Sequence, residues 1–230
     1  MHKLLSLLVG IGLFLAPLLT VQAQSAAVAG RVTLAVQEVV VQNSSSARSV
    51  ERRAEIYVGE TIGTKNREYA ILRMSDTALL ALSCSTTLEI ERYSYEQSQS
   101  DTVSLNLIAG RPCTIVGSIS AKDSTKYRLR ASNSWVSSNA ADFAAAVLDD
   151  DAAYFGVFDG SITLSNRFGT LVLGRDGDAD FARVEPGEPP VALLIYPQQL
   201  NTLSISTNST PNTANTSNTS NTSQTNSSCP

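Results

Sequence analysis

The chain has 230 residues, of which 43% are hydrophobic and 17% are charged, and its formal net charge is −4. This length supports one ordinary domain or at most two small ones. Its only histidine, His2, lies in a segment that we expect to be removed. Histidine-dependent hydrolases, histidine-ligated zinc and histidine acid–base chemistry are therefore excluded. A net negative chain without a basic stripe does not attract phosphate groups, so nucleic acid is not an expected partner.

The N-terminus reads as a secretory signal peptide over residues 1–23. A short positive start precedes an apolar run from Leu4 to Val21, which Pro17 interrupts. Small residues before Gln24 predict cleavage between Ala23 and Gln24. The alternative is an uncleaved N-terminal anchor, because the run approaches the length that spans a bilayer. Both readings place the remaining chain outside the cytoplasm, in the periplasm or secreted.

Apolar residues alternate with polar ones through most of the body, as in half-buried strands. Val32, Leu34 and Val36 show this period, and a change of phase at Gln37-Glu38 predicts a bulge or tight turn. Further alternating runs and the glycines between them predict an all-β fold, either a compact two-layer sandwich or a short barrel or solenoid of many short strands. The best helix candidate, residues 139–148, ranks below a strand because its neighbours have β character.

Composition divides the chain after the signal into three zones. Residues 30–185 form the predicted β domain, and residues 186–200 form a proline-marked exit. Within that exit the apolar run Val191 to Tyr196 is a candidate edge strand. Residues 201–230 are rich in Ser, Thr and Asn and contain no charged residue, which predicts a disordered tail. Asn-Thr-Ser triplets in the tail are glycosylation sequons, although repeat expansion of a linker explains them equally.

The order of turns and strands resembles the FecR domain, an extracytoplasmic β-rich module of bacterial cell-surface signalling regulators. The matching segments are Val58-Gly59-Glu60-Thr61-Ile62-Gly63-Thr64, the strand Tyr69 to Met74 with its turn Ser75-Asp76-Thr77, Thr86-Thr87-Leu88-Glu89-Ile90, Leu107-Ile108-Ala109-Gly110-Arg111, Phe158-Asp159-Gly160-Ser161-Ile162 and Val172-Leu173-Gly174. The similarity covers roughly residues 30 to 185. It implies a module that senses or binds another protein.

Two departures from the family pattern limit what the resemblance implies. The family's Arg-Gly-Thr-x-Phe stretch corresponds to Asn139-Ala140-Ala141-Asp142-Phe143, where only the phenylalanine is kept. Classical members also carry a cytoplasmic helical segment that binds a sigma factor, whereas only three residues precede the apolar run here. We therefore expect a stand-alone secreted form without direct sigma-factor contact.

The three cysteines are Cys84, Cys113 and Cys229. In an oxidising compartment Cys84 and Cys113, which lie in neighbouring runs of the body, are candidates for a disulfide. The alternative is two small buried thiols. Cys229, near the end of the tail, would then be available to cross-link a second chain.

Acidic residues supply the remaining metal candidates. Asp176, Asp178 and Asp180 alternate as calcium ligands do, but Phe181 and Gly187 stand where an EF-hand loop needs its Gly and Glu. An acidic solvated hairpin is the simpler reading, and it applies equally to the triplet at 149–151. No metal or cofactor is expected.

The aromatic residues and the basic residues each allow a functional and a structural interpretation. Tyr93 and Tyr95 share a strand face, and further aromatics are Trp135, Tyr154, Phe155 and Phe158. Such residues stack on sugars in some proteins but more often fill a β core. Arg48, Arg52 and Arg53 form a basic cluster that is expected to be a solvated turn.

No nucleophile motif or phosphate loop is present, so we expect a protein that is not an enzyme. The favoured function is a non-catalytic, FecR-like interaction or sensing module of the cell envelope that binds an envelope protein through strand edges or loops. The alternative function is a glycan-binding surface module or adhesin on a Ser/Thr/Asn-rich stalk, for which cell-wall glycan is the partner.

Overall fold

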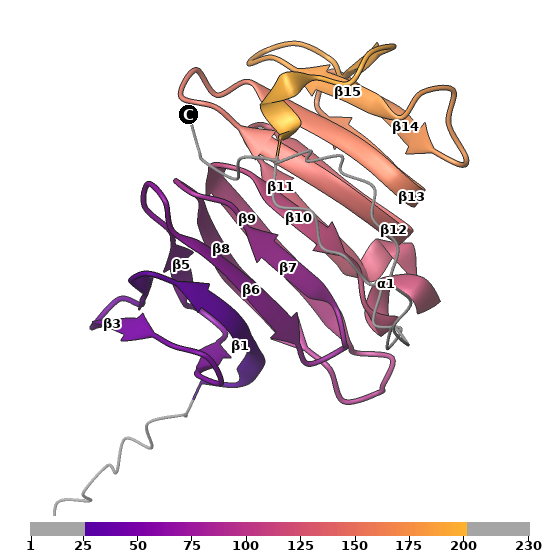
Figure 1. Ribbon diagram of the computed structural model, residues 1–230. Coiled ribbons are helices and arrows are strands. Elements are labelled where there is room, and N and C mark those ends of the chain that lie inside the picture. The colour runs from indigo at the N-terminus through magenta and orange to yellow at the C-terminus, as the bar shows by residue number, and fades with distance from the viewer. Residues whose placement is uncertain (1–25, 202–230) are drawn as a thin grey trace, which may run out of the picture.

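The computed structural model describes residues 26–201 (Figure 1). The predicted signal peptide with its cleavage between Ala23 and Gln24, the sequons of the tail and Cys229 lie outside the described residues. Within residues 26–201, no helix is long and apolar enough to cross a membrane.

Over the part of the chain that the structure describes, sixteen strands form one hydrogen-bonded sheet, which confirms the predicted all-β class. The first eight strands are β1 (Val28–Val36), β2 (Val39–Gln42), β3 (Ala47–Val50), β4 (Glu55–Tyr57), β5 (Thr61–Gly63), β6 (Tyr69–Met74), β7 (Leu79–Leu82) and β8 (Thr87–Ser94). The others are β9 (Thr102–Ala109), β10 (Pro112–Ile115), β11 (Tyr127–Ala131), β12 (Ser134–Val147), β13 (Ala153–Asn166), β14 (Gly169–Gly174), β15 (Phe181–Val184) and β16 (Val191–Leu193). The short helices are α1 (Ser118–Lys122), η1 (Ser124–Lys126) and η2 (Gln198–Leu200).

The main path through the sheet is β3-β2-β5-β8-β9-β11-β12-β10-β7-β6-β1-β4. Strand β12 joins the two parts of this path, because each half of the strand pairs with a different neighbour. Its first half pairs with β11, and the second half pairs with β10. Between them the β12–β13 register breaks from Asn139 to Asp142, and Ala140 has a φ of 49°. The long strand therefore bends between the half that pairs with β11 and the half that pairs with β10.

Contacts at both ends of β12 show how strongly the sheet curls. Val147, at the end of the strand, forms an antiparallel bridge with Gly110. Just before its start, Ser132 Oγ donates a hydrogen bond of 2.6 Å to the carbonyl oxygen of Asp151. The chain segments before and after β12 are thus brought close together, and the strands belong to one curled, continuous sheet (Figure 1).

The hydrophobic core consists of the apolar residues that alternate with polar ones along the strands. Ala70, Leu72 and Met74 of β6 are buried, and so are the inward residues of β8, β9 and β11, which join them in one hydrophobic cluster. The largest fully buried side chains include Phe143 and Phe155 on the two bent strands. Residues 139–148, the best helix candidate, lie in β12 over most of their length, in agreement with the preference for a strand.

Strand β1 departs from the alternation of buried and exposed side chains that its sequence predicts. The register of β1 against β6 shifts between Val32 and Leu34, and Leu34 is consequently 39% exposed while Val32 is buried. A bulge adds one residue to one strand, which turns the following side chains to the other face. The expected turn at Gln37 is present, with a φ of 63°.

Candidate functional site

The most exposed apolar side chains lie on the last strand and the bend that follows it. Strand β16 pairs with β15 through Phe181↔Leu193 and Arg183↔Val191. The side chains of Leu194 and Ile195 are 92% and 81% exposed. An exposed β edge next to adjacent large aliphatic side chains is typical of a protein-interaction site. We call residues 191–196 the β16 edge.

Both ends of this segment are anchored, so the exposed bend is held in a defined place. Tyr196 packs edge-on against Phe181, with ring centroids 5.4 Å apart. Leu200 of η2 is fully buried against Ala144 and Ala146. The Arg111 Nε–H donates a hydrogen bond of 2.8 Å to the carbonyl oxygen of Gln199. The sequence predicted an edge strand here, and the anchoring contacts explain why Leu194 and Ile195 project from the surface.

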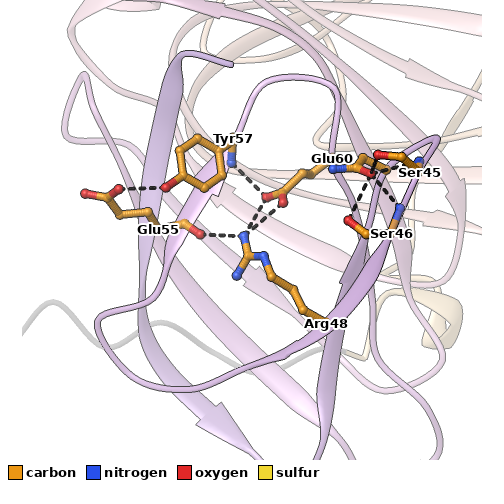
Figure 2. Close-up of polar contacts among 7 residues, drawn as sticks. Ser45, Ser46, Arg48, Glu55, Tyr57 and Glu60 are labelled. Carbon is orange, nitrogen blue, oxygen red and sulfur yellow. Dashed lines mark hydrogen bonds and ion pairs between the residues drawn. The ribbon is translucent and has the colours of Figure 1, made fainter. Parts of the chain in front are cut away.

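A polar network around Glu60 holds the first strands together (Figure 2). The Arg48 Nη2 group donates to both carboxylate oxygens of Glu60, at 2.9 and 3.0 Å, and to the carbonyl oxygen of Glu55 at 2.8 Å. The backbone N–H of Tyr57 donates to the same carboxylate at 2.9 Å. Glu60 is buried, whereas the Arg48 side chain is 39% exposed. Arg48 is therefore a structural ion-pair partner, while Arg52 and Arg53 occupy an exposed turn as expected.

Tyr57 adds a side-chain hydrogen bond and a ring contact to this network. Its hydroxyl donates a 2.9 Å hydrogen bond to a Glu55 carboxylate oxygen, and its ring lies 5.8 Å from the Arg48 guanidinium carbon. The hydrogen bond to Glu55 and the negative charge of that carboxylate raise the pKa of Tyr57. The contacts stabilise β3 and β4 against the turn that precedes β5.

A second buried polar group lies at the predicted Ser75-Asp76-Thr77 turn. Asp76 accepts hydrogen bonds from the Tyr93 hydroxyl and from the backbone N–H groups of Ala78 and Ile119. Burial raises the pKa of Tyr93 well above its ordinary value. These contacts attach α1 to the β6–β7 turn, so we interpret Asp76 as structural.

One of the aspartates that resembled calcium ligands, Asp176, is bound to a serine. Its Oδ2 accepts a 2.7 Å hydrogen bond from the Ser161 hydroxyl, and the neighbouring Arg175 forms a 2.8 Å ion pair with Asp159. In the second acidic stretch Asp150 accepts a hydrogen bond from the backbone N–H of Ala152. Residues 26–201 contain no group of three or more His, Cys, Asp or Glu side chains placed to hold a metal ion.

Cys84 and Cys113 are both buried, but they are not opposite one another. The register of β7 and β10 pairs Cys113 with Ala81, three residues before Cys84. The Cys113 thiol approaches Asp142 Oδ1 at 4.0 Å. The disulfide between Cys84 and Cys113 stays a prediction.

The candidate aromatics separate into core and surface. Tyr93 and Phe155 are buried, and Tyr95 packs against the same core. Phe158 is 52% exposed. Trp135 lies half-buried on the outer face of the sheet, where Arg128 and Arg130 stack near its ring. The aromatic residues therefore do not form the single cluster that their sequence order allowed.

Comparison with known proteins gives limited matches. No family model and no curated protein matches the chain. Among solved structures, it is similar to two crystal structures described as a "putative anti-sigma factor" from Parabacteroides distasonis, at 17% and 16% sequence identity. Each match has a TM-score of 0.45 and covers 57% of this chain and 57% of the solved one. The chain thus spans little more than half the length of these structures.

Proposed function

We propose that this chain is a non-catalytic, extracytoplasmic protein-interaction or sensing module of the bacterial cell envelope, similar to FecR domains, and that the β16 edge binds its protein partner. The observation that carries the proposal is the exposure of Leu194 and Ile195, at 92% and 81%, beside a strand with one described neighbour. The ordered FecR-like segments of the sequence and its predicted signal peptide support the extracytoplasmic assignment.

Burial of these side chains supplies the driving force for binding. Complete burial of one exposed Leu or Ile side chain contributes about 1.5–3 kcal/mol. The anchoring of the segment through Tyr196 and Leu200 lowers the entropy that binding must remove, because the bend is already ordered. Backbone groups on the outer side of β16 add hydrogen bonds if the partner contributes a strand.

The test is a capture experiment with envelope extract and the immobilised chain. Leu194→Ser with Ile195→Ser should abolish recovery of the specific partner, because the double variant removes the apolar contact surface. The matched control is Ile108→Ser, which replaces another exposed aliphatic residue, 50% exposed, on β9. A partner retained equally by the double variant and by wild type would refute the assignment of the β16 edge. Recovery of no reproducible partner by wild type would refute the interaction function itself.

A further inference from the structure

Trp135, the only tryptophan of the chain, lies on an outward sheet face that carries small polar side chains. On β12 it is directly opposite Arg130 of β11 and Ser165 of β13. The neighbours Val136 and Leu164 are completely buried, so the alternation of a strand directs Trp135 and Ser165 to the opposite, outer face. The next pair toward the bend is Ser137↔Thr163, which extends the row of hydroxyl groups.

A groove of about 630 Å³ lies at the end of this face. It is lined by Asn133, Trp135, Ser165, Asn166, Arg167, Phe168, Pro186 and Gly187. One wall is the β13–β14 turn, where Asn166 Oδ1 accepts the backbone N–H of Phe168 at 2.9 Å. The Asn166 side-chain amide also donates a 2.8 Å hydrogen bond to the carbonyl oxygen of Glu188. The two walls are therefore tied together, and the groove has a fixed shape.

Arginines stack on both aromatic rings that line the groove. The guanidinium carbon of Arg128 lies 5.2 Å from the Trp135 ring centroid, and that of Arg167 lies 4.5 Å from the Phe168 ring centroid. Arg130 stacks at 5.7 Å and is neutralised by Glu91 at 2.7 Å. Across residues 26–201, no ion pair involves Arg128 or Arg167. Stacking fixes the guanidinium plane and leaves its N–H groups available for a carboxylate.

We infer that this groove binds a polysaccharide that carries carboxylate groups. The two unpaired arginines supply charge complementarity in a chain whose net charge is negative. Trp135 and Phe168 offer aromatic surface for sugar rings, and Ser165 offers a hydroxyl group. An acidic peptide is the weaker occupant, because β12 is already paired on both sides and has no free edge for a peptide backbone. The inference goes beyond the proposed protein-binding function and uses different residues.

Acidic residues of the Pro186–Gly187 turn act against this attraction and provide a sensitive test. Glu185 is neutralised by Arg183 at 2.9 Å. Glu188 forms no ion pair among the residues that the structure describes, so its charge repels a polyanion near the groove. Glu188→Gln should therefore tighten binding, an effect that a purely structural role of the arginines would not produce.

The binding experiment uses the fluorescence of the single tryptophan. Polygalacturonate added to the full chain at low salt should change Trp135 emission with saturation, and neutral dextran should not. Arg128→Gln and Arg167→Gln should each weaken binding by about fivefold, the upper range for one exposed ion pair. The double variant should lose about 25-fold if the sites act independently. Arg52→Gln, an exposed arginine of the β3–β4 connection, is the matched control and should bind as wild type does.

Three outcomes would overturn the inference. The first is no saturable change with polygalacturonate at low salt for wild type, whose fold is checked by circular dichroism. The second is equal binding of poly-glutamate, which would identify a site for acidic chains in general. The third is equal weakening by Arg52→Gln, which would show non-specific charge attraction. If one arginine variant failed to fold, the other arginine variant and Glu188→Gln would still test the inference, because each has its own expected change in affinity against the Arg52→Gln control.

Discussion

Replacement of Arg48 by methionine should destabilise the protein through the buried carboxylate that it leaves behind. Arg48 makes three hydrogen bonds, two of them to Glu60, and among the described residues the Glu60 carboxylate keeps only the hydrogen bond from the Tyr57 backbone N–H after the change. A hydrogen bond to a charged group contributes about 1.5–3 kcal/mol, and breaking a fully buried ion pair costs about 3–5 kcal/mol. Since Arg48 is 39% exposed, we expect a loss of about 2–3 kcal/mol.

Urea unfolding followed by circular dichroism measures this loss, and a thermal midpoint lowered by about 4–12 °C is its equivalent for a domain of this size. Arg52→Met, in the exposed turn nearby, should change the unfolding free energy by less than about 0.5 kcal/mol. The double variant Arg48→Met with Glu60→Met should recover much of the loss, because neither charge remains buried. If Arg48→Met were no more harmful than Arg52→Met, the network of Figure 2 would not stabilise the fold and the reasoning would be refuted.

Three further changes test other parts of the structure by urea unfolding. Gly110→Ala should cost about 1–3 kcal/mol and more than Gly59→Ala, because both glycines have positive φ but only at Gly110 would a Cβ meet backbone atoms. Leu200→Ala should cost about 2–5 kcal/mol, since Leu200 is completely buried; a smaller effect would show that η2 does not anchor the β16 edge. Burial first, and the charge of Asp159 second, raise the pKa of Asp142, so ionisation destabilises the fold above the ordinary value of 3.8. Asp142→Asn should therefore stabilise at pH 7, and a gain that did not shrink as the pH fell toward 3.8 would contradict this cause.

The period-two pattern was sufficient to predict the fold class because burial alternates along strands such as β6, and along β9 as far as Leu107. It failed where a bulge intervened, as at Leu34, because a one-residue insertion in one strand has no signature in composition. The sequence pattern also did not predict that the strands belong to one continuous sheet. It depends on the bend of β12 near Ala140, and alternation on both sides of the bend looks the same whether a strand stays in one layer or passes between two.

The candidate sites depended on contacts between residues distant in sequence. Arg48 lies on β3 and Glu60 lies directly before β5, and both stand among other charged residues that are solvated, so the sequence could not identify the pair. Arg167 stacks on its neighbour Phe168, but Arg128 reaches Trp135 only because β11 and β12 pair. The β16 edge was the exception. An uncharged apolar run after a proline-rich exit indicated an edge strand directly, since such a run must either be buried or be available to a partner.

The β16 edge and the groove at Trp135 share no residue, so the two binding activities should be separable. Leu194→Ser with Ile195→Ser should abolish partner capture and leave the fluorescence response to polygalacturonate unchanged. Arg128→Gln with Arg167→Gln should abolish the fluorescence response and leave partner capture unchanged. The rings on which these arginines stack, Trp135 and Phe168, lie outside the β16 edge. Loss of both activities in either variant, with the fold intact by circular dichroism, would mean that the two surfaces are coupled. Two routes connect the surfaces: the segment after Pro186 and Gly187, which line the groove and precede β16, and strand β13, which carries Ser165 and Asn166 of the groove and pairs with β15 beside β16.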